Sequence, residues 1–198
     1  MDLVVIIGPQ AVGKMTVGRE LEKRMDARLL YNHETIDLFA KFLDYGEETF
    51  RLSDQTRKEL FKAFVKNKTN KVASIIFTVV VAFDLKEDVE FLQEISDIFL
   101  NTDGRVFFVE LEADLETRLE RNVGESRLMA KPSKRNVEFS RNELLKTHEK
   151  HRLNSLPNEV DERFQPVNYL RINNTYLEPE ETAERIAEFI RSKDESNY

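Results

Sequence analysis

Residues 3–21 read Leu-Val-Val-Ile-Ile-Gly-Pro-Gln-Ala-Val-Gly-Lys-Met-Thr-Val-Gly-Arg-Glu-Leu, and this stretch decides the fold. Its first residues, Leu3 to Ile7, are apolar and mostly β-branched, which is typical of a buried strand. Gly8 ends the apolar run. An amphipathic pattern begins at Lys14, with apolar residues on one helical face at Val17, Leu21 and Met25. The stretch therefore predicts a strand, a loop and a helix.

The loop has the spacing G-x-x-x-x-G-K, from Gly8 to Lys14. Its glycines let several backbone N–H groups turn toward one anion, and the N-terminus of the next helix adds partial positive charge. Lys14 supplies an ammonium for β- and γ-phosphates. The alternative is a glycine-rich turn with a surface lysine, but the strand, the spacing and the helix together favour binding of a nucleoside triphosphate. The predicted nucleotide-binding residues are Gly8, Pro9, Gln10, Ala11, Val12, Gly13, Lys14, Met15 and Thr16.

One position departs from the motif, because Met15 stands where Ser or Thr usually follows the lysine. Mg²⁺ prefers oxygen ligands, so a thioether cannot replace the hydroxyl. Either water and the phosphates hold the metal, or Thr16 reaches it. The sequence Gly-Lys-x-Thr resembles the Gly-Lys-Gly-Thr form of adenylate kinases and related nucleoside monophosphate kinases. That resemblance implies that Thr16 lies near the α- and β-phosphates.

The composition excludes several classes of protein. The chain has 198 residues, no cysteine and a net charge of −7. Disulfides and thiolate metal sites are thus excluded, and the acidic charge argues against a nucleic-acid partner. The N-terminal apolar run is too short to span a membrane and has no basic stretch before it, as a signal peptide would. We expect one domain over residues 1–198 in a soluble, cytoplasmic protein.

Apolar strands alternate with helical patterns along the chain, which predicts a three-layer α/β fold with a parallel sheet and helices on both faces. The expected strands are residues 1–8, 28–31, part of 72–83, 105–111 and 169–172. The expected helices are 14–25, a segment from Ile36 to Leu43, a helix capped by Ser53, 88–100, a helix capped by Asp114, 136–150 and a helix from Pro179. Ligands bind beyond the carboxyl ends of such strands, which predicts that residues 8–16, 32–37, 78–84, 112–114 and 173–176 lie at one edge.

The order of elements is similar to that of P-loop kinases of the nucleoside monophosphate kinase and shikimate kinase type. The resemblance implies a P-loop NTPase fold with a five-stranded parallel sheet, an acceptor-binding segment at 33–70 and a helical, arginine-bearing lid at 122–152. It also implies that Asn173 begins a loop that brackets adenine. The Gly-Gly-Gly of shikimate kinases and the Asp-Gly-Phe-Pro-Arg of adenylate kinases are missing from the sequence.

Charged residues near this edge are candidates for catalysis. A lid that clamps a phosphoryl group needs positive charge, and Arg121 and Arg127 are the best candidates, although each could equally face solvent. Asp84 follows an apolar strand and is either a Mg²⁺-orienting aspartate or a turn residue. Asp37 and His33 follow the second strand, where either could accept a proton from a hydroxyl. Asp37 could instead be a first-turn acid of its helix.

These residues predict a kinase that transfers the γ-phosphoryl group of ATP, with Mg²⁺, to an unidentified small acceptor. Lys14, Arg121, Arg127 and Asp37 are the candidate catalytic residues, and Thr16 and Asp84 the candidate metal ligands. The alternative is a nucleotide-binding regulatory protein, or a slow NTPase, without a small acceptor. The absence of Asn-Lys-x-Asp favours adenine over guanine only mildly.

Overall fold

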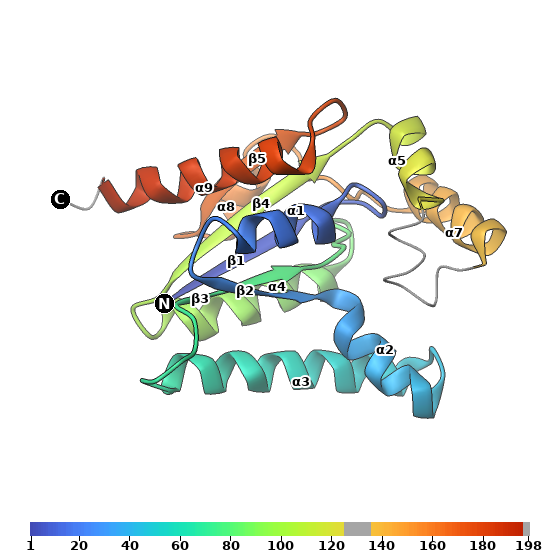
Figure 1. The fold of residues 1–198 in the computed structure, drawn as a ribbon. Coiled ribbons are helices and arrows are strands. Elements are labelled where there is room, and N and C mark those ends of the chain that lie inside the picture. Colours follow the sequence, from blue (N-terminus) through green and yellow to red (C-terminus); the bar gives the residue numbers. More distant parts are fainter. Residues whose placement is uncertain (125–135, 196–198) are drawn as a thin grey trace.

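The computed structural model describes residues 1–124 and 136–195, which form a three-layer α/β fold. Five strands make one parallel sheet in the order β2-β3-β1-β4-β5 (Figure 1). The strands are β1 (Asp2–Ile7), β2 (Ala27–Tyr31), β3 (Ser74–Thr78), β4 (Arg105–Glu112) and β5 (Asn168–Asn173). The predicted five-stranded parallel sheet is confirmed.

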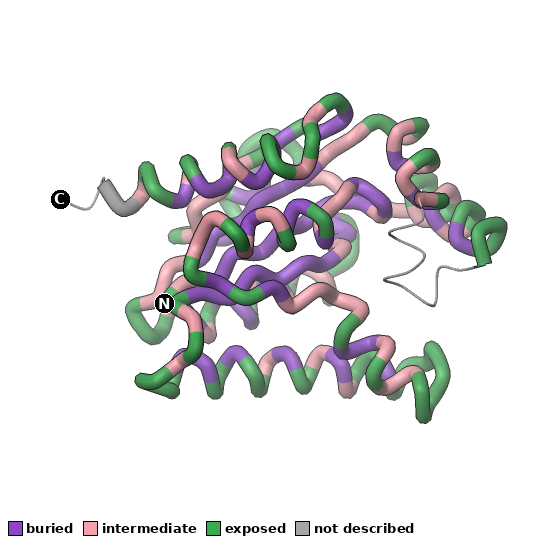
Figure 2. Tube along the Cα trace, viewed as in Figure 1, coloured by how far each residue is buried: buried purple, intermediate pink, exposed green. Residues whose placement is uncertain are grey.

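Helices cover both faces of the sheet, as expected for buried parallel strands. They are α1 (Lys14–Glu22), α2 (Asn32–Leu43), α3 (Glu47–Lys66), α4 (Lys86–Leu100), α5 (Leu115–Asn122), α7 (Val137–Lys150), α8 (Glu159–Arg163) and α9 (Pro179–Glu195). Helices α1 and α9 pack on one face, and α3, α4 and α8 on the other. The central strands β3, β1 and β4 are almost continuously buried, whereas the edge strands β2 and β5 are partly exposed (Figure 2).

Strand β1 shows why its sequence is apolar at every position. Side chains of a strand alternate between the two faces of the sheet. Leu3, Val5 and Ile7 therefore join the core under α3, α4 and α8, whereas Val4 and Ile6 join the core under α1 and α9. Because both faces are covered, the central strand has no solvated side.

Aromatic side chains fill much of the core under α3 and α4. Phe61 of α3 is fully buried and makes edge-to-face contacts with Phe77 of β3 and Phe99 of α4, at ring-centroid distances of 5.6 and 5.9 Å. Such geometry adds to the free energy gained from burial alone. These rings fix α3 and α4 against the sheet.

The structure corrects one helix boundary. Ser53 was expected to cap a helix, but α3 begins at Glu47, with Gly46 at its N-cap position. Ser53 lies inside α3, where its hydroxyl shares a 2.6 Å hydrogen bond with Thr35 of α2. The acidic residues of the first turn, Glu47 and Glu48, suit the helix dipole and indicate the true start. Ser53 therefore joins α2 to α3.

Two other segments compare differently with the sequence patterns: one agrees with its prediction, and one was not predicted. The apolar run 72–83 is a strand only over Ser74–Thr78, and the remainder is a loop at the carboxyl end of β3, as expected. Helix α8 has no counterpart among the expected helices, because five residues are too few for a periodic signal. The carboxyl ends of the strands nevertheless lie together at one edge of the sheet, beside α2 and the α5–α7 pair (Figure 1).

The aromatic core provides a test of the fold. We expect Phe61→Ala to lower the free energy of unfolding by about 3–5 kcal/mol, because it leaves a cavity among Phe77 and Phe99. Urea denaturation measures this change. Phe42→Ala is the matched control: Phe42 is 81% exposed, so its truncation should change stability by less than about 0.5 kcal/mol. Equal losses in both variants would contradict this packing.

Candidate active site

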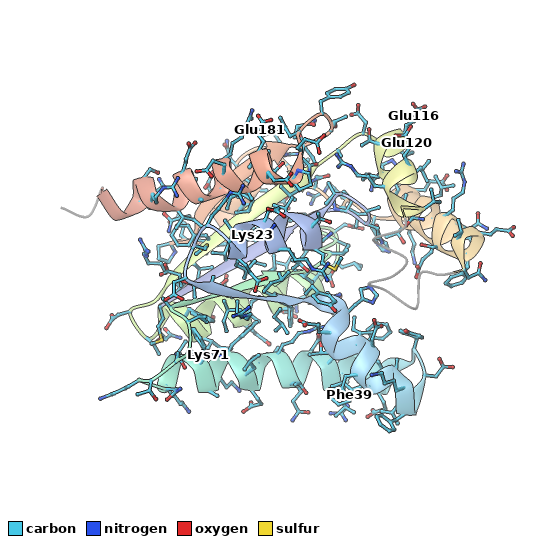
Figure 3. The ribbon with its side chains drawn as sticks, viewed as in Figure 1. Lys23, Phe39, Lys71, Glu116, Glu120 and Glu181 are labelled. Carbon is cyan, nitrogen blue, oxygen red and sulfur yellow. The ribbon has the colours of Figure 1, made fainter. Side chains whose placement is uncertain are left out.

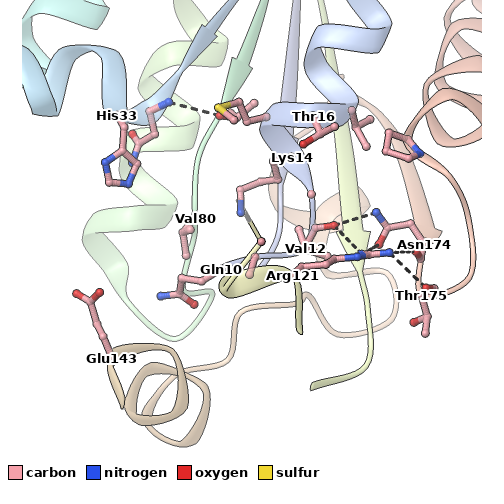
Figure 4. A pocket seen from close by; sticks show the side chains of 18 of the residues that line it. Gln10, Val12, Lys14, Thr16, His33, Val80, Arg121, Glu143, Asn174 and Thr175 are labelled. Carbon is pink, nitrogen blue, oxygen red and sulfur yellow. Dashed lines mark hydrogen bonds between the residues drawn. The ribbon is translucent and has the colours of Figure 1, made fainter. Parts of the chain in front are cut away.

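A cavity of about 980 Å³ lies at the carboxyl edge of the sheet (Figure 4). Four of the five predicted edge segments contribute to its lining: the loop after β1, the start of α2, the end of β3 and the segment after β5. Helices α5 and α7 add Arg121, Phe139 and Glu143. This volume is at the upper end of the range for small-molecule sites and suits two bound ligands side by side.

The loop between β1 and α1 is held by an unusually close backbone approach. Gly8 has φ +135°, and a Cβ atom at this position would lie 2.3 Å from the carbonyl oxygen of Leu111 on β4. Gly13 has φ +106°, and Ala11 also has a positive φ. These conformations curl the loop, and any side chain at Gly8 would push it off β4.

Lys14 lies across this loop. Its Nζ donates hydrogen bonds to the carbonyl oxygens of Gly8 at 2.6 Å and Pro9 at 2.8 Å. The ammonium is therefore held inside the curl of the backbone, beside the N-terminus of α1. A cation at this position, surrounded by turned backbone, is suited to an anionic group with several oxygens.

Met15 and Thr16 both line the cavity but differ in burial. Met15 is 9% exposed and packs in the core under α1 and α9, and its thioether is a poor ligand for Mg²⁺. Thr16 is exposed and lines the cavity. The departure from the usual Ser or Thr thus places a core side chain at position 15, and the loop keeps one hydroxyl, on Thr16.

Asn174 and Arg121 join this loop to the segment after β5 (Figure 4). Asn174 Nδ2 donates to the carbonyl oxygen of Val12 at 2.9 Å, and Arg121 Nη1 donates to the same oxygen at 3.2 Å. Arg121 Nη2 donates to the carbonyl oxygens of Asn174 and Thr175. Burial of the guanidinium lowers the pKa of Arg121. Arg121 thus binds main-chain carbonyls and ties α5 to both segments.

The structure places Asn174, and not the predicted Asn173, in the cavity lining. Asn173 is exposed and is not part of the cavity lining; its Oδ1 accepts a hydrogen bond from the Thr175 backbone N–H. Asn174 lines the cavity instead. The sequence Asn-Asn offered no basis for choosing between them, because the choice depends on where β5 ends.

Three side chains from the α2 region form a hydrogen-bonded group at the other end of the cavity. His33 Nδ1 lies 3.4 Å from Asp37 Oδ1, and the Tyr45 hydroxyl donates to the same oxygen at 3.1 Å. His33 and Tyr45 line the cavity, whereas Asp37 lies behind them. Asp37 is therefore linked to the cavity by its contact with His33 and does not line the cavity itself.

Asp84, predicted as a metal ligand, lies elsewhere. Its carboxylate accepts hydrogen bonds from His151 Nδ1 at 3.0 Å and from the Arg152 backbone N–H at 2.8 Å. These bonds lower the pKa of Asp84. Strand β3 ends at Thr78, and the cavity lining takes Thr78, at the end of that strand, and Val80, two residues later. The structure thus places Asp84 beside the C-terminal end of α7 and outside the cavity lining.

No protein-family model matches the sequence, and no curated protein matches it. Solved structures do resemble it. A candidate kinase from Chloroflexus aurantiacus matches with a TM-score of 0.62 and 17% identity, over 100% of this chain and 97% of that one. Shikimate kinase from Acinetobacter baumannii, in complex with shikimate, matches with a TM-score of 0.50 and 20% identity, over 97% and 93% of the two chains. The chain has the P-loop kinase fold.

A further structure with this P-loop kinase fold is a tunicamycin resistance protein from Deinococcus radiodurans, with a TM-score of 0.52 and 18% identity over 96% of this chain and 95% of that one. At these identities the likeness concerns the fold. Within the described part of the chain, no helix has the length and apolar character needed to cross a membrane.

The oxygen atoms around the Gly8–Lys14 loop decide whether the site could hold Mg²⁺. Among residues 1–124 and 136–195, no group of three His, Asp or Glu side chains could hold a metal. The hydroxyls of Thr16 and Thr78 line the cavity. The described residues therefore fit a magnesium ion that arrives with the nucleotide and takes most of its ligands from phosphates and water.

Several cavity residues escaped the sequence analysis. Tyr45, Phe50, Phe139 and Glu143 come from the α2–α3 junction and from α7, and none carries a motif. For these four residues the sequence analysis offered only the expectation that segments 33–70 and 122–152 approach the site. Arg127, the second predicted lid arginine, lies outside the described residues.

The close approach at Gly8 gives a test of the loop. We expect Gly8→Ala to cost at least about 1–3 kcal/mol of stability, because the new Cβ would collide with the Leu111 carbonyl and because alanine disfavours this φ. Thermal and urea denaturation measure the loss. The control is Gly46→Ser, at a helix N-cap with nothing within 4 Å of an added Cβ, which should not destabilise. A fully stable Gly8→Ala protein would contradict the loop geometry.

Proposed function

We propose that this protein is a kinase that transfers the γ-phosphoryl group of Mg-ATP to a small-molecule acceptor. The observation that carries the proposal is one cavity with two different ends. One end holds the Gly8–Lys14 loop, and the other holds His33 and Tyr45. A regulatory NTPase has no need for the second end, which favours a kinase over that alternative.

The nucleotide end supplies the groups that bind a triphosphate. Lys14 would exchange its bonds to Gly8 and Pro9 for oxygens of the β- and γ-phosphates, and the backbone N–H groups of the loop and α1 would hold the same anion. Thr16 adds a hydroxyl near these phosphates. Arg121 and the residues from Asn174 to Pro179 form the wall on which we place the adenine. Magnesium, when bound, neutralises charge on the phosphate oxygens.

The acceptor end supplies a base. Nδ1 of His33 lies 3.4 Å from Asp37 Oδ1, and because a carboxylate accepts hydrogen bonds we assign the proton to Nδ1 and the lone pair to Nε2. A hydroxyl of the acceptor gives its proton to Nε2 while its oxygen bonds to the γ-phosphorus. The bond between that phosphorus and the β–γ bridging oxygen breaks, and ADP leaves with the electron pair. Asp37 and Tyr45 orient the imidazole, and Asp37 stabilises the imidazolium.

Helix α7 contributes to the same reaction by covering the cavity. Phe139 and Glu143 of α7 line it, and Arg121 anchors the preceding α5. Exclusion of water from the transferring group prevents hydrolysis and strengthens the electrostatic contacts. The proposal that 122–152 acts as a lid rests on these contacts.

The proposed reaction is tested by ADP release from Mg-ATP in the presence of a panel of alcohols and nucleoside monophosphates. We expect slow release without an acceptor and faster release with one. Bound ATP without any acceptor response would favour the regulatory alternative.

Lys14→Ala tests the nucleotide end. We expect transfer to fall by about 10²-fold or more, because the charge of Lys14 acts on the phosphates. Stability should change little. Lys23→Ala is the matched control, since Lys23 lies at the C-cap of α1, away from the cavity, and pairs with Glu20 (Figure 3). Turnover that is equal in the two variants would contradict the assignment.

His33→Gln tests the acceptor end. We expect kcat to fall by about 10²–10⁴-fold with little change in the KM for ATP, because the base acts in the chemical step. Asp37→Asn should lower kcat less. A change in the KM for ATP alone would contradict this role.

A further inference from the structure

Two side chains hold the carbonyl oxygen of Val12 from outside the Gly8–Lys14 loop. Asn174 Nδ2 donates to this oxygen at 2.9 Å, and Arg121 Nη1 donates to it at 3.2 Å. Arg121 Nη1 also donates to Asn174 Oδ1 at 3.4 Å, so the two side chains support one another. A carbonyl oxygen has two lone pairs, and both are occupied here. The direction of the Val12 carbonyl is therefore fixed by its neighbours.

Asn174 is itself anchored to the sheet. It is 2% exposed, and its backbone N–H donates to the carbonyl oxygen of Glu112 at 2.9 Å. This bond lies directly beyond the last paired residues of β4 and β5, Glu112 and Asn173. A buried side chain in a close-packed interior has little freedom to move. Asn174 thus ties the Val12 carbonyl to the carboxyl edge of the sheet.

The direction of the Val12 carbonyl also fixes the direction of the Gly13 N–H. The peptide between these residues is trans, and a planar trans peptide points its C=O and its N–H in opposite directions. Asn174 and Arg121 lie on one side of the loop, and the Lys14 ammonium lies on the other (Figure 4). The Gly13 N–H therefore points to the side of Lys14. The first N–H groups of α1, which have no partner within the helix, follow it directly.

This peptide could otherwise turn over. Such a rotation mainly changes ψ of Val12 and φ of Gly13. Because glycine accepts both signs of φ, sterics alone do not force the observed value of +106° at Gly13. The opposite orientation would turn the Val12 oxygen toward the Lys14 side. The hydrogen bonds from Asn174 and Arg121 thus select one of two orientations that the backbone allows.

We infer that Asn174 is a positioning residue for the phosphates of the nucleotide and that it acts through the peptide between Val12 and Gly13. This inference rests on the proposed kinase function. Asn174 keeps the Val12 oxygen outward, and the Gly13 N–H thereby joins the donors that bind the triphosphate. Without Asn174 the peptide occupies both orientations, and in the second a carbonyl oxygen faces and repels the phosphate oxygens. This role is separate from any contact of Asn174 with the adenine.

A triphosphate without a base separates an effect on the phosphates from an effect on the adenine. Mg-tripolyphosphate and Mg-AMP-PNP are titrated by calorimetry into the full chain and into its Asn174→Ala variant. We expect Asn174→Ala to weaken both ligands by about tenfold, because both lose the same hydrogen bond from Gly13 to a charged group. Asn168→Ala is the matched control: Asn168 Nδ2 also donates to a backbone carbonyl, that of Val106 at 3.3 Å, but at the opposite end of β5. Its Kd values should stay within about twofold of those of the unaltered chain.

Four results of these titrations would overturn the inference. Weakening of Mg-AMP-PNP alone would mean that Asn174 acts on the adenine. The other three are no weakening of either ligand, equal weakening by Asn168→Ala, and an unaltered chain that binds Mg-AMP-PNP but not Mg-tripolyphosphate.

The amide signals of the loop test the mechanism itself. A hydrogen bond to a phosphate moves an amide proton downfield, and an NMR spectrum of the isotope-labelled full chain reports each N–H separately. With saturating Mg-AMP-PNP we expect downfield shifts at Gly13 and Lys14 in the unaltered chain. In Asn174→Ala the shift at Gly13 should shrink while that at Lys14 remains. Loss of both shifts would indicate a general loss of loop structure, and an unchanged shift at Gly13 would show that the peptide needs no support; either result overturns the inference.

The failure of this inference can be told apart from the failure of the kinase function. If Mg-AMP-PNP does not bind the unaltered chain, or binds equally well to Lys14→Ala, the kinase function fails and this inference fails with it. If the nucleotide binds through Lys14 and Asn174→Ala binds both ligands as tightly as the unaltered chain, the kinase function stands and only the role of Asn174 is overturned.

Discussion

The backbone of Gly8 lies directly against the Leu111 carbonyl of β4, and the rest of the site depends on this contact. The sheet order places β1 between β3 and β4, so the loop after β1 leaves at the centre of the carboxyl edge. Only glycine allows that loop to turn there with φ +135°. Lys14, the N-terminus of α1 and the Val12 carbonyl then take their positions from the loop. Asn174 and Arg121 bind that carbonyl and so connect α5 and the segment after β5 to the same point.

The sequence predicts the sheet well because its signals are local and strong. Leu3 to Ile7 are apolar at every position, which indicates a strand covered on both faces, and β1 confirms it. Boundaries that depend on tertiary contacts are harder to predict. Ser53 has the chemistry of an N-cap, yet its hydroxyl serves a buried bond to Thr35 between two helices. A propensity describes what a residue can do locally and cannot anticipate such a partner.

The site residues also fall into two groups: those that the local sequence predicts and those whose position depends on tertiary contacts. The loop Gly8–Lys14 is contiguous, so its motif could be recognised from spacing alone. Asp84 was expected to close an apolar strand, but β3 ends at Thr78 and Asp84 lies in the loop beyond it. Its partners, His151 and Arg152, come from a segment far along the chain. Asp37 and His33 were both candidates to face the acceptor, and the structure puts His33 in the cavity lining with Asp37 hydrogen-bonded to it. Which of two neighbouring polar residues reaches a cavity depends on helix orientation, and composition does not encode it.

The central claim is that one cavity holds a nucleotide at the Gly8 loop and an acceptor at His33. A crystal structure with Mg-AMP-PNP tests it most directly. The account predicts the γ-phosphate within hydrogen-bonding distance of Lys14 Nζ, with that nitrogen released from the Gly8 and Pro9 carbonyls, and the adenine beside Arg121 and Asn174. A nucleotide whose base lies against His33 and Phe50, or whose phosphates lie away from the Gly8 loop, would contradict it.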